Sequence, residues 1–330
     1  SDEDRARVLA VPDRFEGYTT TRIDATLVLT LYDDARAAVV ELETTARGYV
    51  VLERTPFYIE SGGQISDTGR ITVEDDAGVA EVDGVERLAP GGPRVHHVRV
   101  TQGRLRTGDL VTAEVDRERR DAIRRNHTAT HLLHTALRDQ LGTHVKQAGS
   151  LVAPERLRFD FTHVESVSRD AQREIEDRVN AIVRGDLVLV KRQESYLDAT
   201  GRGALAFFDE RYGETVRTIQ IGEDAPVSFE LCGGTHLDRP PVVEDPDRVA
   251  GGERVVGHAT KLDGVAILDR HLPGTGIWTV VMTGAPHDAG AVLEHLGTGH
   301  GSSLSDRAGL DHDGGASGPP GRVRVAGSAP

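Results

Sequence analysis

The chain has 330 residues, of which 38% are hydrophobic and 28% are charged, and this length favours two or three domains. The formal net charge of -14 argues against broad, non-specific binding to nucleic acid but allows a local basic patch. No apolar run reaches the ~20 residues that a membrane-spanning helix needs, and the polar start Ser1–Asp4 predicts no signal peptide.

Cysteine and methionine are each represented once. Because Cys232 is the only cysteine, no disulfide can form within the chain. A reducing, cytoplasmic location fits this composition, and so does a metal-binding or catalytic role for the thiol. The only methionine is Met282, and the chain does not begin with Met, so we expect a fragment or a processed form of a longer protein.

Short strands separated by Gly- and Asp-containing turns are predicted for the first third of the chain, after a polar lead-in over residues 1–20. The expected strands are Thr26–Leu31, Val39–Leu42, Gly48–Leu52, Gly69–Val73, Val95–Val100 and Leu110–Val115. Many short strands of this kind are typical of a small β-barrel or sandwich, which we expect to span residues 21–115.

A long amphipathic helix is predicted over Arg117–Gln140, because the apolar spacing changes from two to about 3.6 residues at Asp116. Gly142 is expected to end this helix. A second helix should run from the N-cap Ser168 to about Gly185.

Antiparallel strands are expected around these two helices. They are Arg156–Phe161, Leu187–Lys191, Ala204–Phe208, Val216–Ile221 and Ser228–Leu231. Helices and strands in this order predict an α+β domain over residues 116–236.

The remaining residues, 237–330, differ in composition from the rest of the chain. Gly, Pro, His and Asp become frequent, and Trp278 is the only aromatic residue after His236. We expect a largely irregular tail, with one short helix at Ala289–Leu296 and disorder from Gly297 onward.

Two short motifs carry potential metal ligands. His127 and His131 are four residues apart on the predicted helix, so their imidazoles lie on one face. Cys232 and His236 flank paired glycines, which would let the backbone turn so that both side chains reach one point. Three imidazoles and one thiolate suit zinc. In an alternative interpretation Cys232 is a nucleophile with His236 or His131 as its base, although the sequence shows neither an oxyanion hole nor an orienting carboxylate.

A group of arginines precedes His127 on the same helix. Arg120 and Arg124 share its face by i, i+3 and i+4 spacing, so they would flank the metal. Together with Arg125 they would suit a phosphate or a nucleic-acid terminus. The alternative is a solvated helix face whose arginines pair with nearby acidic residues, which are Asp116, Glu118 and Asp121.

Five motifs, in this order and spacing, resemble those of alanyl-tRNA synthetases and their free-standing editing relatives. They are Arg54–Gln64 with Asp67–Gly69, Asn126–His134, Leu141–Leu151, Leu157–Phe161 and Glu230–His236. The resemblance covers roughly Phe15 to His236. The residues after His236 depart from the family pattern.

The resemblance implies a small antiparallel β-barrel followed by an α+β editing domain that binds zinc through His127, His131, Cys232 and His236. It implies that Thr130 and Gln147 handle the mischarged amino acid and that Gln64 lies near the site, so these three are the expected catalytic residues. The partner would be tRNA(Ala) mischarged with Ser or Gly, bound in part by Arg120, Arg124 and Arg125, and the reaction would be hydrolysis of its ester. ATP and Mg²⁺ would serve only the adenylate-forming region of the family, which has no counterpart here.

The hydroxyl group of serine gives a physical reason why an editing site could act on Ser-tRNA(Ala) and spare Ala-tRNA(Ala). A group that hydrogen-bonds this hydroxyl is left unpaired by alanine, and Thr130 is a candidate, although a helical threonine often bonds back to its own backbone instead. Because four protein ligands close a tetrahedron, we expect the zinc mainly to shape the pocket. Two alternatives remain: a non-catalytic, zinc-stabilised tRNA-binding module, and an unrelated zinc hydrolase, for which the His-Thr-Ala-Thr-His helix lacks a catalytic Glu.

Overall fold

The computed structural model describes residues 11–74, 77–206, 212–238, 265–266 and 277–283. By its contacts the chain divides into two units, Ser1–Ala289 and Gly290–Pro330, and every described residue belongs to the first.

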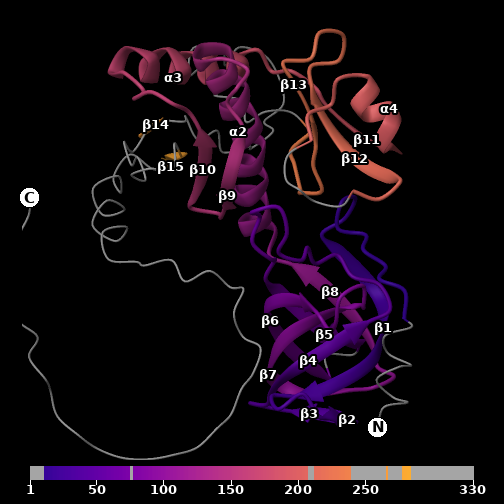
Figure 1. The fold of residues 1–330 in the computed structure, drawn as a ribbon. Coiled ribbons are helices and arrows are strands. Elements are labelled where there is room, and N and C mark those ends of the chain that lie inside the picture. Colours follow the sequence, from indigo (N-terminus) through magenta and orange to yellow (C-terminus); the bar gives the residue numbers. More distant parts are fainter. Residues whose placement is uncertain (1–10, 75–76, 207–211, 239–264, 267–276, 284–330) are drawn as a thin grey trace, which may run out of the picture. The chain divides into compact units, whose positions relative to one another are not determined.

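Six antiparallel strands form a closed barrel in the N-terminal part (Figure 1). The sheet order is β1–β4–β7–β6–β5–β8, and β8 pairs back onto β1. The bounds are β1 Arg22–Asp33, β4 Arg47–Leu52, β5 Gly69–Val73, β6 Gly78–Arg87, β7 Arg94–Arg106 and β8 Leu110–Val115. Two short strands, β2 (Ala38–Val39) and β3 (Glu41–Glu43), pair with β1 and β7. The barrel, rather than the sandwich, is therefore the correct alternative.

Strand β6 was not expected from the sequence. Asp83-Gly84 suggests a turn, but the structure uses these residues for an irregularity in the β6–β7 pairing between Val82 and Gly84. Apolar residues alternate along the strand on both sides of this point, and Val82 and Val85 both enter the barrel core. The chain therefore continues as a strand through a sequence that resembles a turn.

The long helix α2, Arg117–Leu141, confirms the predicted helix almost to the residue. The Asp116 carboxylate caps it by accepting a 3.0 Å hydrogen bond from the Arg119 amide. Gly142 ends it with a φ of 112°, which a residue with a side chain rarely adopts. The second helix, α3 (Arg169–Arg184), also begins after its predicted N-cap, Ser168.

Two further sheets accompany these helices. One has the order β14–β15–β10–β9, and the other has the order β11–β12–β13 with the short helix α4 beside it. The bounds are β9 Gln147–Val152, β10 Arg156–Thr162, β11 Leu189–Ser195, α4 Tyr196–Gly201, β12 Thr215–Ile221, β13 Ser228–Leu231, β14 Val265–Ala266 and β15 Ile277–Thr283. This arrangement agrees with the α+β class.

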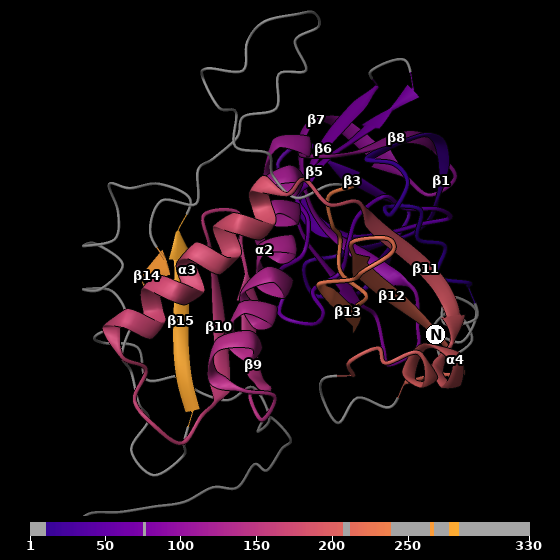
Figure 2. The same cartoon turned by 90° about the horizontal axis from the view of Figure 1, so that it is seen from above.

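A single core joins α2 and α3 to both sheets. The backbones of these elements are drawn in Figure 2. Leu133 of α2, Phe159 of β10, Ile175 of α3 and Ile221 of β12 are all fully buried in it. Burying a side chain of this size stabilises a fold by about 1.5–3 kcal/mol. The apolar face of α2 is therefore fixed, and the residues next to it along the helix are held in place.

The structure corrects several expectations about individual segments. Strand β9 and helix α4 were not predicted. Of the expected strand Ala204–Phe208 the structure describes residues 204–206, and among these only Leu205 forms a β-bridge, an isolated one to Glu230. Within the tail, β15 pairs with the whole of β10, and Val280 is fully buried in the core. These tail residues are therefore regular rather than irregular, whereas the expected helix at 289–296 and the disorder after it lie outside the described residues.

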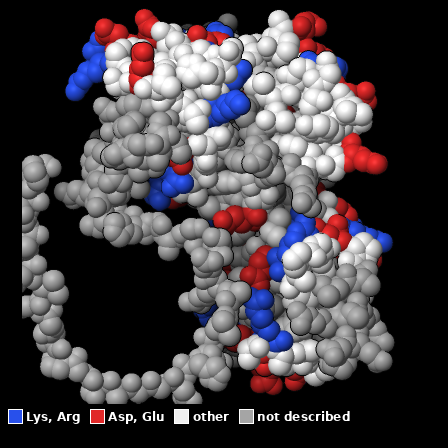
Figure 3. Space-filling model, viewed as in Figure 1, with Lys and Arg blue, Asp and Glu red and all other residues white. Residues whose placement is uncertain are grey.

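None of the described helices is long and apolar enough to cross a membrane. On the face shown in Figure 3, the coloured side chains of Lys and Arg lie among those of Asp and Glu.

Candidate metal centre and adjoining cavity

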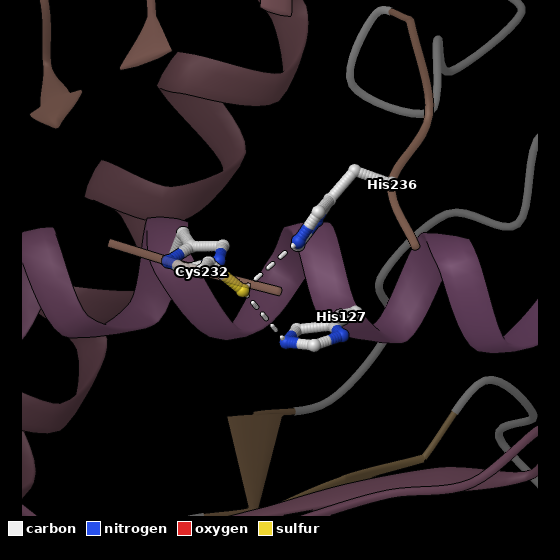
Figure 4. Close-up of side chains that lie close together, drawn as sticks. His127, Cys232 and His236 are labelled. Carbon is white, nitrogen blue, oxygen red and sulfur yellow. Dashed lines mark hydrogen bonds between the residues drawn. The ribbon is translucent and has the colours of Figure 1, made fainter. Parts of the chain in front are cut away.

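The structure brings the four predicted donors together. His127 and His131 project from α2, and Cys232 and His236 come from the segment after β13. Figure 4 shows His127, Cys232 and His236 close together. Their ligand atoms all lie within 4.8 Å of one another, so the four side chains, here called the His/Cys cluster, can hold a metal ion. All but Cys232, which is partly buried, are shielded from solvent.

Two of the distances within the His/Cys cluster are those of donors on a tetrahedral ion. The Sγ atom of Cys232 lies 3.5 Å from Nε2 of His127 and 3.3 Å from Nε2 of His236. Bonds of ~2.3 Å to sulfur and ~2.0–2.1 Å to nitrogen at tetrahedral angles separate two such donors by about 3.5 Å. Nε2 of His131 is buried, and the His131 ring interacts with the Cys232 thiol, as expected of two donors that face one ion.

Each imidazole of the cluster is also held from its far side. Nδ1 of His127 contacts Oε1 of Gln64 at 2.8 Å, and Nδ1 of His131 contacts Glu230 at 2.5 Å. Nδ1 of His236 lies 3.4 Å from the Thr128 hydroxyl. An imidazole that donates from Nδ1 carries its lone pair on Nε2, so these contacts direct the three Nε2 atoms toward the cluster.

Two hydrogen bonds with Thr235 fix the orientation of the Gln64 side-chain amide. Its Oε1 accepts a 2.8 Å hydrogen bond from the backbone N–H of Thr235, and its Nε2 donates to the Thr235 hydroxyl at 2.9 Å. Because Oε1 must be the atom facing that N–H, Nδ1 of His127 has to be a donor. Gln64 is fully buried and is not among the described residues that line the neighbouring cavity. These contacts fit a positioning role for Gln64, whereas its expected catalytic role stays a prediction.

Glu230 is the main residue that the sequence interpretation missed. It precedes Cys232 by two residues on β13, is buried, and receives Nδ1 contacts from His131 at 2.5 Å and from His134 at 2.9 Å. The sequence had shown no orienting carboxylate, because only the folded sheet brings Glu230 beside α2. Its place in the Glu230–His236 motif was the available signal.

Neighbouring charges shift the pKa values of Cys232, His131 and Glu230 toward their charged forms. Burial by itself raises the pKa of the Cys232 thiol, but the surrounding His127, His236 and His131 outweigh burial and bring this pKa well below its ordinary value. Burial also opposes the charged forms of His131 and Glu230, yet their mutual attraction raises the pKa of His131 to about 10 and lowers that of Glu230 to about 2. Without a metal ion His131 is therefore an imidazolium, and it has to release the Nε2 proton before this nitrogen can bind one. Cys232 is therefore poised as a thiolate, the form that binds metals.

Of the two glycines between Cys232 and His236, Gly234 is required for close packing. A Cβ atom added to Gly234 would lie 2.0 Å from the His127 ring, which no side chain can tolerate. Neither glycine of this pair has a positive φ, and the requirement for glycine at position 234 comes from the space that His127 occupies. Arg217 donates to the backbone oxygens of Cys232 and Gly234 at 3.0 and 2.7 Å and so steadies the same segment.

A cavity of about 280 Å³ opens beside the His/Cys cluster. His127, His131 and Cys232 line it, and so do Thr130 and Gln147, the residues predicted to handle an amino acid. The Thr130 hydroxyl donates to the backbone oxygen of Asn126 at 2.9 Å, which is the local bond considered as its alternative role. This bond uses the only proton of the hydroxyl and leaves its lone pairs as acceptors.

The predicted arginines are not equivalent. Arg120 is fully buried, bonded to the Asp67 carboxylate and to the backbone oxygens of Gly17 and Pro56. The prediction that Arg120 contacts RNA is therefore wrong, because its donors are committed inside the protein. Arg124 pairs with Asp121 at 3.1 Å, as the alternative interpretation proposed, and Arg125 is partly exposed.

Comparison with known proteins identifies the family. A model described as tRNA synthetases class II (A) matches residues 1–119. The alanine–tRNA ligase of Chloroflexus aurantiacus is 47% identical over 233 residues, covering 68% of this chain and 26% of the relative. The alanine–tRNA ligase of Halorhodospira halophila is 46% identical over 246 residues, which cover 73% of this chain and 28% of the relative. The alanine–tRNA ligase of Myxococcus xanthus is 51% identical over 190 residues, which cover 58% of this chain and 21% of the relative. The chain thus spans only about a quarter of the length of the curated relatives it matches. On these similarities the chain belongs to the alanyl-tRNA synthetase family.

Proposed function

We propose that this chain is an editing module that binds zinc in the His/Cys cluster and hydrolyses the ester of Ser-tRNA(Ala) or Gly-tRNA(Ala). The observation that carries the proposal is the cavity of about 280 Å³, because potential metal ligands and a polar helix residue border the same space. We propose that a polar lead-in (1–20) and the barrel (21–115) precede this editing part (116–236), with residues 237–330 following it.

Thr130 would give the site its preference for serine. Its hydroxyl already donates to Asn126 and retains acceptor capacity, so a seryl hydroxyl in the cavity can donate to it. An alanyl methyl group cannot do so. A missing hydrogen bond of this kind is worth about 1–3 kcal/mol, or roughly a 5- to 150-fold preference. This argument separates serine from alanine only, and the reaction with Gly-tRNA(Ala) rests on family membership.

Hydrolysis requires a water molecule to attack the ester carbonyl carbon while the ribose oxygen of the tRNA departs with a proton. Gln147 borders the cavity and is partly buried, so its amide can hold the ester or the attacking water by hydrogen bonds. Gln64 and Glu230 act one step further away by fixing the rings of His127 and His131. Arg124 and Arg125 are the remaining candidates for contact with the tRNA backbone.

A bound zinc ion would supply a fixed positive charge at the wall of the cavity. Four protein ligands fill a tetrahedron, and closed sites of this kind are usually structural. We therefore propose that the metal chiefly holds α2 against the segment Cys232–His236 and so keeps the cavity in shape. The same closed ligand set also favours a second candidate function, a non-catalytic tRNA-binding module.

Deacylation of Ser-tRNA(Ala) and Ala-tRNA(Ala) by the full chain tests the proposal, with zinc measured on the same sample. We expect about one zinc per chain from the four-ligand cluster and faster release of serine than of alanine. Equal rates for the two substrates would contradict the editing function, and binding of tRNA without hydrolysis would favour the second candidate.

A matched pair of threonine variants tests the source of the preference. Thr130→Val removes the hydroxyl at nearly constant volume and should bring the serine and alanine rates together. Thr200 on α4 makes the same backbone bond four residues back, at 2.8 Å to Tyr196, but is not among the described cavity residues. Thr200→Val should therefore keep the preference for serine, and its loss in both variants would mean that the hydroxyl of Thr130 has no special role.

A further inference from the structure

Glu230 is held from several directions by buried polar groups. One carboxylate oxygen, Oε2, accepts from Nδ1 of His131 at 2.5 Å. The other, Oε1, accepts from Nδ1 of His134 at 2.9 Å and from the hydroxyl of Ser228 at 3.2 Å. All four residues are buried, with exposed fractions of 6% or less. Hydrogen bonds to both oxygens therefore fix the orientation of the Glu230 carboxylate toward α2.

Only one of the two histidines on this carboxylate belongs to the His/Cys cluster. His131 is a cluster member, whereas His134 lies on the next turn of α2 and packs against Phe159 with the ring centroids 5.4 Å apart. His134 and Ser228 hold Oε1, so the carboxylate cannot rotate without breaking two hydrogen bonds. Oε2 is thereby kept on His131.

We propose that Glu230 is the positioning residue for the metal: it holds His131 in the tautomer that presents Nε2 to the ion, and His134 locks Glu230 in place. The proposal rests on the metal-binding part of the proposed function and names a residue that acts through a ligand rather than as one. Carboxylates that accept a hydrogen bond from a metal-binding histidine orient the ring and increase its basicity, and their loss typically weakens metal binding 10- to 100-fold.

The chemistry requires a carboxylate at this position. Both rings donate from Nδ1, and an ionised carboxylate can accept from both at once. An amide offers one acceptor oxygen and one donor group, so a glutamine can satisfy only one of the two rings in this tautomer. Glu230→Gln should therefore loosen His131 or force His134 to change tautomer, although the side chain keeps its size.

The first test measures zinc affinity by competition with a chromophoric chelator, using the full chain. We expect Glu230→Gln to bind zinc 10- to 100-fold more weakly than the unmodified chain. Glu194→Gln is the matched control, because Glu194 also accepts three hydrogen bonds, from Arg202 and Thr218, and contacts no cluster member. Its zinc affinity should change by less than about threefold. An equal affinity for the unmodified chain and Glu230→Gln would overturn the proposal.

A second readout separates positioning from general damage. With Co²⁺ in place of zinc, Glu230→Gln should keep the thiolate-to-cobalt absorption of Cys232 but lose intensity in the visible bands, toward the spectrum of His131→Ala. A general loss of structure would remove both features. An unchanged visible spectrum together with weaker binding would assign the effect to charge alone and reject the positioning role.

A third measurement needs no variant and remains decisive if Glu230→Gln does not fold. The imidazole nitrogen spectrum of the ¹⁵N-labelled, zinc-loaded chain reports each tautomer. We expect His131 to carry its proton on Nδ1, protected from exchange, and a proton on Nε2 would overturn the proposal. Failure of the unmodified chain to bind zinc at all would instead contradict the proposed function, so the two outcomes are distinguishable.

Discussion

Replacing Gln64 with leucine removes a buried hydrogen-bonding group at nearly constant size. In the native chain its Oε1 accepts from two donors, Nδ1 of His127 and the backbone N–H of Thr235, each at 2.8 Å. Gln64→Leu leaves both donors buried and unpaired. Each such donor costs about 1–3 kcal/mol, so the free energy of unfolding should fall by about 2–6 kcal/mol in total. The His127 ring also loses the contact that orients it, which should weaken zinc binding by roughly 10- to 100-fold.

Urea unfolding followed by circular dichroism measures the first effect, and chelator competition measures the second. Gln172→Leu is a suitable control, because Gln172 makes one hydrogen bond, to Val167, and is partly exposed. It should change stability by no more than about 0.5 kcal/mol. Gln64→Glu keeps an acceptor for both donors and should recover most of the lost zinc affinity. If Gln64→Leu had the same free energy of unfolding and the same zinc affinity as the native chain, the positioning role would be refuted.

Three further perturbations have expected outcomes. Cys232→Ser replaces a soft thiolate by a hydroxyl, so zinc affinity measured by chelator competition should fall by on the order of tenfold or more, and an unchanged affinity would remove Cys232 from the ligand set. Arg120→Ala leaves the Asp67 carboxylate buried without its partner and should lower the free energy of unfolding by about 3–5 kcal/mol in urea, whereas a loss near zero would contradict the buried ion pair. His96 is buried and its pKa is lowered by burial to about 4 from 6.5, so the unfolded chain takes up this proton at a higher pH than the folded one. Stability should therefore decline as pH falls from 6.5 to 4, by up to about 3 kcal/mol, and a His96→Asn chain with the same decline would exclude this cause.

Local sequence patterns determined the helices and most strands, because the relevant forces act within a few residues. The caps Asp116 and Ser168 and the stop at Gly142 place the ends of α2 and α3 where the apolar period predicts them. The same period puts His127 and His131 on one face of α2, so half of the cluster was fixed by helix geometry alone. Strand β6 escaped prediction because an irregular pairing with β7, which no local pattern records, carries it through Asp83-Gly84.

Tertiary structure alone decided what surrounds the ligands. Gln64 reaches the cluster from a loop after β4 and contacts His127, which is 63 residues away in the sequence. Glu230 reaches it from β13 and contacts His131, which is 99 residues away. Tertiary packing likewise turned Arg120 inward onto Asp67, although helix periodicity had placed it beside the histidines. Spacing along one element can predict which side chains share a face, but the partners that orient and charge those side chains come from elsewhere in the chain, and only packing brings them into contact.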